Sequence, residues 1–528
     1  MLGPELSLLV LNAVLLTLAV VPLLMWRYRR AVLAGMMARG GAALAPAPPQ
    51  ALPQAPPQAG TAAAALAWER RLHWRVVVAV LGVVFLSALP LSALFVWLND
   101  LPRTPLHLYP KAGVLATLAV PMAAVLIAMP FARALRLWLA VLLALAAAGV
   151  VLSMLQRLAQ GRAPSLDQAL NFVFFLQLAG VTLWLPLALL LASGARRVRG
   201  IAPIVLAGLL VFALGPLLGM RLTLWLSGTR SGAAWVLAGP GLDTGFVLLA
   251  LPMGWLAWWR LKALARAYEA KRFSDAQLLL RTWWVLVVAV ELIDLVNAKP
   301  DAVLQALAAA ALSLAAFGAM LAAALRRAAA LPGRPPARTL LVLRVFGDAA
   351  RSEALFDRIV ARWRWFGPVT LIAAPDVVAR TVDPGDFLRF AAGDIGSTFV
   401  TSQAELDLRL ATLDTVPDPD GRYRINEFCC NDATWQATVV KLIERADAVV
   451  MDLRGYGPQR AGCSFELGEL ARRRRPEQVL LLADASTDRA FLEPLLGRGA
   501  QRLGLLELAR GPGKGFDAAF ARLLAAAR

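Results

Sequence analysis

Nine long apolar stretches constrain this chain more than any other feature. They lie at residues 5–26, 76–98, 112–132, 137–155, 168–193, 201–226, 243–259, 282–298 and 302–325. Each is long enough to cross a hydrocarbon layer of about 30 Å. The composition agrees, because 59% of the 528 residues are hydrophobic and only 17% are charged. The sequence therefore predicts a multi-pass protein of the lipid bilayer.

The positive charge predicts how the chain crosses the membrane. With the N-terminus outside, the loops on the inner side hold 22 Lys and Arg residues and those on the outer side hold seven. Short cytoplasmic loops retain positive charge, so we expect an inner-membrane protein with a cytoplasmic C-terminal part. Residues 340–528 hold 25 basic and 25 acidic residues, so the net charge of +19 lies in the apolar part. Nucleic acid is therefore not an expected partner.

Changes in composition divide the chain into five regions. We expect a first span with its inner flank at 1–41, a Pro/Ala-rich linker at 42–66, a transmembrane domain at 67–330, a short linker at 331–338 and a cytosolic domain at 339–528. The fold class is an α-helical polytopic membrane region of about nine spans, followed by a three-layer α/β domain with a mostly parallel sheet. Predicted strands lie at 340–346, 369–373, 448–453, 479–483 and 503–507. Predicted helices lie at 352–365, 384–392, 402–413, 433–445, 464–474, 487–495 and 516–527.

Two features of the membrane region invite interpretation. Basic and apolar residues alternate over 260–281, which is typical of a helix lying on the inner leaflet or of a span extending out of the membrane. Glu291 and Asp294 are three residues apart in one apolar stretch, so they share a helix face. Charges at that depth line an ion pathway or meet a partner, for which Arg221 is a candidate.

Metal sites and disulfides find little support in the residue counts. The chain has two histidines and three cysteines, Cys429, Cys430 and Cys463. The cysteines lie in the charge-balanced C-terminal part without the spacing of a zinc site, so we expect reduced thiols, no metal and no bound cofactor.

The strongest candidate for chemistry is the stretch ADAVVMDLRGYGPQRAGCSFELGEL, residues 446–470. It predicts a strand that ends at Asp452, a Gly-containing loop and a helix opened by Cys463 and Glu466. In an open α/β sheet, ligands bind beyond the carboxyl ends of the strands, so both carboxylates are expected at one crevice. Arg344 and Asp348, around the end of the first strand, are candidate contacts for the rest of a ligand.

The same residues carry a resemblance. ADAVVMDL, a loop and GCSFELGEL resemble the second half of the nucleoside 2-deoxyribosyltransferase-like fold, and Cys463, Glu466 and Leu467 are similar to the Cys-x-x-Glu-Leu helix of TIR domains. In both families the glutamate acts in cleavage of an N-glycosidic bond. The resemblance implies that Glu466 is catalytic, that Asp452 holds a ribose hydroxyl or transfers a proton, and that Cys463 contacts the substrate, a nucleoside or nucleotide such as NAD.

Three functions stay open at this point. The cytosolic domain is an N-glycosidic bond hydrolase or transferase in which Glu466 stabilises the developing positive charge or attacks the sugar. Alternatively it is a non-catalytic signalling or interaction module that assembles with itself, in which Glu466 only favours the dipole of its helix. The third is a transporter whose pathway passes Glu291 and Asp294.

Overall fold

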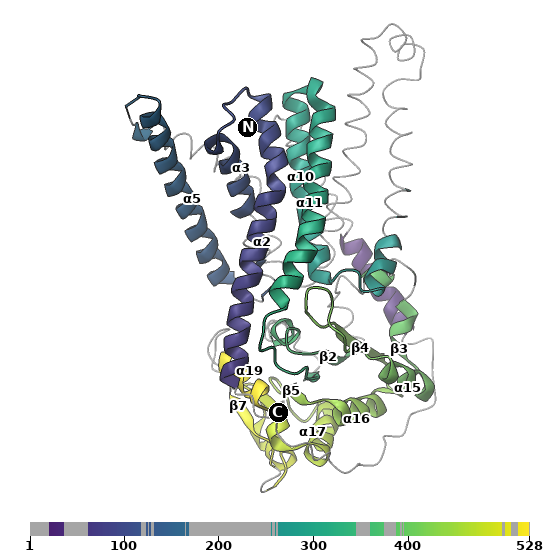
Figure 1. Cartoon of the computed structure of the whole chain (residues 1–528). Helices are drawn as coiled ribbons and strands as arrows, with labels where there is room; N and C mark the ends of the chain where they lie inside the picture. Colours follow the sequence, from purple (N-terminus) through teal and green to yellow (C-terminus); the bar gives the residue numbers. More distant parts are fainter. Residues whose placement is uncertain are drawn as a thin grey trace, which may run out of the picture. The chain divides into compact units, whose positions relative to one another are not determined.

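The chain forms two compact units in a computed structural model (Figure 1). The structure describes residues 21–35, 62–117, 123–167 except 125, 128–130 and 164, single positions 255 and 259, and 262–344, 359–373, 387–498 except 391, 392 and 394, 502–507 and 516–526. The helical unit contains Met1–Trp26, Arg75–Arg327 and Val382–Ala392, and the α/β unit contains Arg27–Trp74, Ala328–Thr381 and Gly393–Arg528.

Long apolar helices dominate the helical unit. They are α2 (Ala62–Leu98, from residue 75 onward), α3 (Pro105–Thr117), α5 (Phe131–Ala159), α10 (Asp275–Ala298) and α11 (Val303–Ala329), with a short 3-10 turn η1 at Pro300–Ala302. Within the described residues, three helices are long and apolar enough to span a membrane: Ala62–Leu98, Leu135–Ala159 and Val303–Ala329. A membrane region is thus supported, whereas the figure of about nine spans is not. The predicted stretches at 168–193, 201–226 and 243–259 lie almost entirely outside the described residues.

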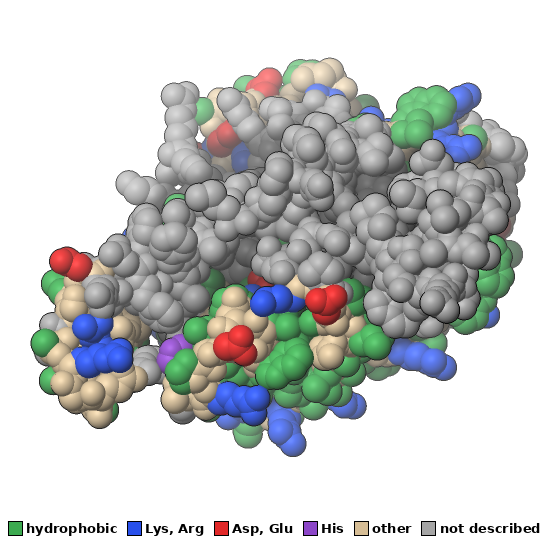
Figure 2. All heavy atoms as spheres, turned by 90° about the horizontal axis from the view of Figure 1, so that it is seen from above, with side chains coloured by type: hydrophobic (Ala, Val, Ile, Leu, Met, Phe, Trp, Pro, Cys, Tyr) green, Lys and Arg blue, Asp and Glu red, His purple; other side chains and the backbone are tan. Residues whose placement is uncertain are grey.

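Exposed apolar side chains are what a membrane helix presents to lipid. Along α5, large apolar residues lie half exposed or more, namely Leu143, Val151, Leu152, Leu155 and Leu158. Hydrophobic side chains also cover much of the described surface seen from above in Figure 2. A continuous surface of this kind is unfavourable in water but is solvated by acyl chains.

The basic loop before α10 folds into a helix and a tight turn. Residues 262–269 are helical, and Lys271 adopts a positive φ of 53°. Ser274 then starts α10 with a capping box: its hydroxyl accepts from the Gln277 amide, and the Gln277 side chain accepts from the Ser274 amide, each at 3.1 Å. These reciprocal bonds satisfy two helix-end donors and fix where α10 begins.

The apolar residues of this loop pack against protein. Tyr268 and Phe273 are buried in one cluster with Leu388, a residue more than 100 positions later in the sequence. Arg389 Nε donates to Glu269 Oε1 at 2.8 Å beside it. The predicted amphipathic face is therefore covered by residues 387–390, which accounts for the place of Val382–Ala392 in the helical unit.

The α/β unit is built on a seven-stranded sheet in which every pairing is parallel. The strands are β1 (Leu340–Arg344), β2 (Val369–Ala373), β3 (Phe399–Val400), β4 (Ile425–Cys430), β5 (Ala448–Asp452), β6 (Val479–Ala483) and β7 (Leu505–Glu507), in the order β3-β4-β2-β1-β5-β6-β7. The predicted parallel sheet is confirmed. Two of its strands, β3 and β4, were not predicted, because β3 is two residues long and Asn426 and Glu427 interrupt the apolar run of β4.

Helices cover both faces of this sheet. Alternate strand residues such as Leu341 and Val449 join one core with α15 (Gln403–Ala411), α16 (Trp435–Arg445) and α17 (Ala461–Arg473). Their neighbours Leu340 and Val450 are buried on the opposite face, and α19 (Phe516–Ala526) contacts β5 and β6. Short elements complete the unit: η2 (Ile395–Thr398), η3 (Pro476–Gln478), α18 (Arg489–Leu492) and η4 (Glu493–Leu495). This is a three-layer arrangement.

The first turns of α2 also belong to the α/β unit. Trp68 stacks edge-on against Phe366 with ring centroids 5.6 Å apart, and its indole donates to the carbonyl of Leu331. Buried Glu69 accepts two bonds from Arg362, at 2.7 and 2.5 Å. The domain predicted to start at residue 339 is thus completed by residues from about 290 positions earlier, which the prediction had placed in the transmembrane domain at 67–330.

Candidate functional site

The sheet has one topological switch point. From β1 the chain moves to β2 on one side, and it later returns to place β5 on the other side of β1. The last residues of the two strands, Arg344 and Asp452, are partners in the β1–β5 register. A crevice at the carboxyl ends of two such strands is where open α/β sheets bind ligands. The prediction that this strand ends at Asp452 is confirmed, with Arg344 beside it in the sheet, whereas a ligand crevice there stays a prediction.

Asp452 is held by the loop that follows it. All five residues of β5 are buried, and Asp452 has no exposed surface. Its Oδ1 accepts from the Arg454 amide at 3.1 Å and from Arg454 Nε at 2.9 Å, while its Oδ2 accepts from Arg454 Nη2 at 2.8 Å. The buried negative charge is thereby paired with a guanidinium in a fork-like geometry.

The loop from β5 to α17 is fastened to its surroundings. Gly455 has a φ of 74°, which favours glycine, and its amide donates to Ser486 Oγ at 2.9 Å. Tyr456 is buried, and its hydroxyl lies 2.8 Å from Ser464 Oγ in the first turn of α17. The start of α17 is thus positioned relative to the end of β5.

Glu466 is a buried carboxyl that lacks a balancing cation among the described contacts. It lies on α17 between residues that enter the core, such as Cys463 and Leu467, and only 2% of it is exposed. Its Oε2 has no hydrogen-bond partner within the described part of the chain. Burial raises the pKa of Glu466 to about 8, because the charged form loses its hydration. The group is therefore mostly protonated at neutral pH, which suits a proton donor.

The remaining predicted site residues divide into two groups. Cys463 of α17 is buried in the core cluster, and the thiols of Cys429 and Cys430 are also buried, with no disulfide at any of the three. Desolvation raises the pKa of Cys430 to about 11, so its thiol stays protonated. Asp348 and the side chain of Arg344 lie outside the described residues.

Glu291 in α10 has a partner that the sequence did not reveal. Lys111 Nζ of α3 lies 2.6 Å from Glu291 Oε2, and both side chains are about 85% buried. The ammonium also sits 4.4 Å from the centre of the Phe95 ring, a cation–π contact from α2. The proposed partner Arg221 and the side chain of Asp294 lie outside the described residues. The pair joins three helices and balances the charge of Glu291.

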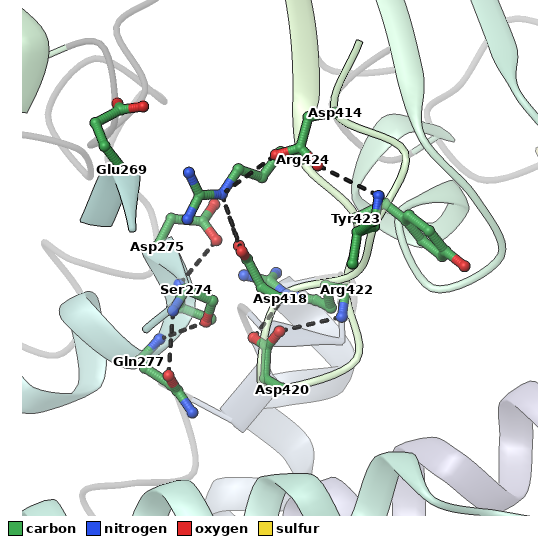
Figure 3. Close-up of polar contacts among 12 residues, drawn as sticks. Glu269, Ser274, Asp275, Gln277, Asp414, Asp418, Asp420, Arg422, Tyr423 and Arg424 are labelled. Atoms are coloured by element: carbon green, nitrogen blue, oxygen red, sulfur yellow. Dashed lines mark hydrogen bonds and ion pairs between the residues drawn. The ribbon is translucent and has the colours of Figure 1, made fainter. Parts of the chain in front are cut away.

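A second buried polar cluster occupies the loop before β4 (Figure 3). Arg424 Nε donates to both oxygens of Asp418, at 2.9 and 3.0 Å, and lies 3.9 Å from Asp414. Arg422 Nε donates to Asp420 at 3.3 Å. In the segment DPDGRYR two acids at every second position are followed by two arginines at every second position, and that pattern was the available signal for this network. Each of these acids has an arginine of the same loop opposite it.

Comparison with protein families, curated proteins and solved structures gives no match. The function must therefore be argued from the site. Within the described residues, no group of three or more His, Cys, Asp or Glu side chains is arranged to hold a metal ion.

Proposed function

We propose that the α/β unit binds a nucleotide or nucleoside at the β1–β5 crevice and cleaves its N-glycosidic bond. One observation carries the proposal: a buried, unpaired and protonated carboxyl, Glu466, stands on the helix that follows the switch-point strand. Strongly perturbed carboxyl groups in such crevices are candidates for acid–base catalysis. Asp452, paired with Arg454, is the candidate ligand for the ribose hydroxyls.

The chemistry follows from the protonation of Glu466. As the C1–N bond breaks, its electron pair goes to the base nitrogen, which takes the proton of Glu466. Water then attacks C1 and returns a proton to the Glu466 carboxylate, which restores the starting state. A neutral purine or pyrimidine needs this proton to leave. Nicotinamide leaves NAD as a neutral molecule without one, so the geometry favours ordinary nucleosides and nucleotides over NAD.

The membrane region is proposed to anchor and regulate this domain. We infer nine spans in an inner membrane, with the N-terminus outside and the α/β unit in the cytoplasm, because 22 of 29 basic residues up to residue 339 then lie inside. Assembly into a homo-oligomer belongs to the alternative, a signalling module without catalysis. The transporter alternative is less favoured, since Lys111 already neutralises Glu291.

Turnover by the full chain tests the proposal. Residues 62–74 pack on the α/β unit, so a fragment starting at 339 is not a fair sample. Purified protein in detergent is incubated with AMP, adenosine, other nucleosides and NAD, and released base is followed by chromatography. We expect release that is lost in Glu466→Gln and kept in Glu477→Gln, which changes an exposed carboxylate beyond the end of α17. No release from folded protein would leave the non-catalytic module as the better reading.

A further inference from the structure

Asp452 cannot receive a ribose hydroxyl in the conformation described above. Both of its oxygens are engaged by Arg454, through three hydrogen bonds of 2.8 to 3.1 Å. No surface of Asp452 is exposed to a ligand. The side chain of Arg454 must therefore move before this carboxylate can bind sugar.

Moving Arg454 without compensation is costly. It would leave a buried carboxylate without its cation, and an unpaired buried charge is strongly unfavourable. A neutral sugar supplies hydroxyl donors for Asp452 but offers nothing to the guanidinium. A ligand that also carries an anionic group offers hydroxyl donors to Asp452 and a negative charge to the guanidinium of Arg454.

We propose that Arg454 selects phosphate-bearing ligands by exchanging Asp452 for the phosphate of a nucleotide. The guanidinium fork suits two phosphate oxygens as well as it suits a carboxylate. The freed oxygens of Asp452 then accept bonds from the ribose hydroxyls, so the buried charge keeps its hydrogen bonds. This inference rests on the proposed function and narrows its substrate class to nucleotides.

The surroundings of Arg454 permit this exchange. Its side chain is 14% exposed, so it already borders solvent. The backbone next to it is fixed, because the Gly455 amide donates to Ser486 and the Tyr456 amide donates to the carbonyl of Leu453 at 3.0 Å. The guanidinium can therefore turn about its own side-chain torsions while the loop and Asp452 stay in place.

Binding of AMP and adenosine separates the outcomes. Calorimetric titration uses the full chain with Glu466→Gln as background, so that the glycosidic bond stays intact. With Arg454 present we expect AMP to bind at least about tenfold more tightly than adenosine, which is about 1.4 kcal/mol. Arg454→Gln should reduce this preference to about twofold or less. Arg489→Gln removes a more exposed arginine that pairs with Glu507, and it should keep the preference.

Each alternative result has a distinct meaning. Equal affinities with Arg454 present, or a preference that survives Arg454→Gln, would overturn the inference while nucleotide binding stands. No binding of either ligand to folded protein would overturn the proposed function together with the inference. If Arg454→Gln fails to fold, the double variant Asp452→Asn/Arg454→Gln removes both charges and should likewise bind AMP and adenosine equally.

Discussion

Two buried groups of acids in the α/β unit differ in how their charges are met. In the loop before β4, Asp418 and Asp420 face Arg424 and Arg422, which follow within six residues. At the end of β5, Asp452 is paired with Arg454. Glu466, on the following helix α17, has a buried oxygen with no hydrogen-bond partner among the described residues. Both groups are almost fully shielded from water. The two groups differ in whether each carboxyl is paired with a cation, and not in how deeply the side chains are buried.

The difference separates charge-balanced carboxylates from an unbalanced one. A matched ion pair keeps its charges at any ordinary pH and holds a loop in one conformation. An unmatched carboxyl shifts its pKa and becomes neutral instead, and natural proteins retain such groups mainly where proton transfer or ligand binding needs them. The comparison predicts that substitutions in the two places change stability in different ways.

The largest loss of stability is expected from Asp418→Asn. It removes the carboxylate charge that accepts two hydrogen bonds from the buried Arg424 guanidinium. Breaking a buried pair in this way costs about 3–5 kcal/mol. Denaturant unfolding of the full chain, followed through the α/β unit, measures the change.

The double variant Asp418→Asn/Arg424→Gln is the control for that prediction. Because it removes both charges, it should recover part of the stability that Asp418→Asn loses. A loss below about 1 kcal/mol in the single variant would show that this network resembles an exposed ion pair. The proposed contrast between the paired acids before β4 and the unpaired Glu466 would then have no energetic basis.

Glu466→Gln should instead stabilise the protein, and only toward higher pH. The folded state keeps the proton up to about pH 8, whereas the unfolded side chain loses it near pH 4.5. Stability therefore falls as pH rises from about 4.5 to about 8 and is level above that range. Gln carries no such dependence, so at pH 8 the variant should be more stable by roughly 2–3 kcal/mol, allowing for burial of its amide.

Glu469→Gln is a matched control one turn away on α17. Burial raises the pKa of Glu469, but hydrogen bonds from Arg473 and Arg472 outweigh burial and lower it overall. Its contribution to stability is present at neutral pH and is lost as pH falls through the folded-state pKa. Unfolding curves that extend below pH 4.5 as well as up to pH 9 should therefore depart from the parent in opposite ways: Glu466→Gln gains relative stability as pH rises above 4.5, whereas the relative loss of Glu469→Gln disappears as pH falls below 4.5. Parallel curves would mean that Glu466 is ionised and paired in the folded protein.

The smallest effect is expected from Glu507→Gln. Glu507 and Arg489 form an ion pair in which the side chains are 72% and 40% exposed. Exposed pairs of this kind contribute about 0–1 kcal/mol, and salt screens them. Thermal unfolding with and without added salt measures the difference. A loss of stability as large as that of Asp418→Asn would show that burial does not explain why the buried and the exposed ion pair differ.

Much of the α/β unit could be predicted because its strands are short apolar runs. The strands at 369–373 and 479–483 begin and end where the sequence pattern places them, and α16, α17 and α19 agree within three residues at each end. Strand β4 could not be found in this way, since it pairs through its backbone while Asn426 and Glu427 break its apolar pattern. Periodicity reports which residues are buried and says little about backbone pairing.

The candidate site was predictable in position and less so in detail. The strand that ends in Asp452 and the following helix with Glu466 were predicted and are present, and a common crevice for the two carboxylates stays a prediction from parallel topology. The pairing of Arg454 with Asp452, and the isolation of Glu466, depend on side-chain geometry that no spacing encodes. The same holds for Lys111 and Glu291, which are 180 residues apart and meet only after α3 and α10 have packed.

The contact of Glu69 with Arg362 has a consequence for the route of the chain through the bilayer. Two residues that touch outside a bilayer lie on the same side of it. For a chain that spans the membrane, this contact requires an even number of crossings between Trp74 and Ala328, whatever the number of helices. The eight apolar stretches that the sequence predicts in that interval satisfy this parity.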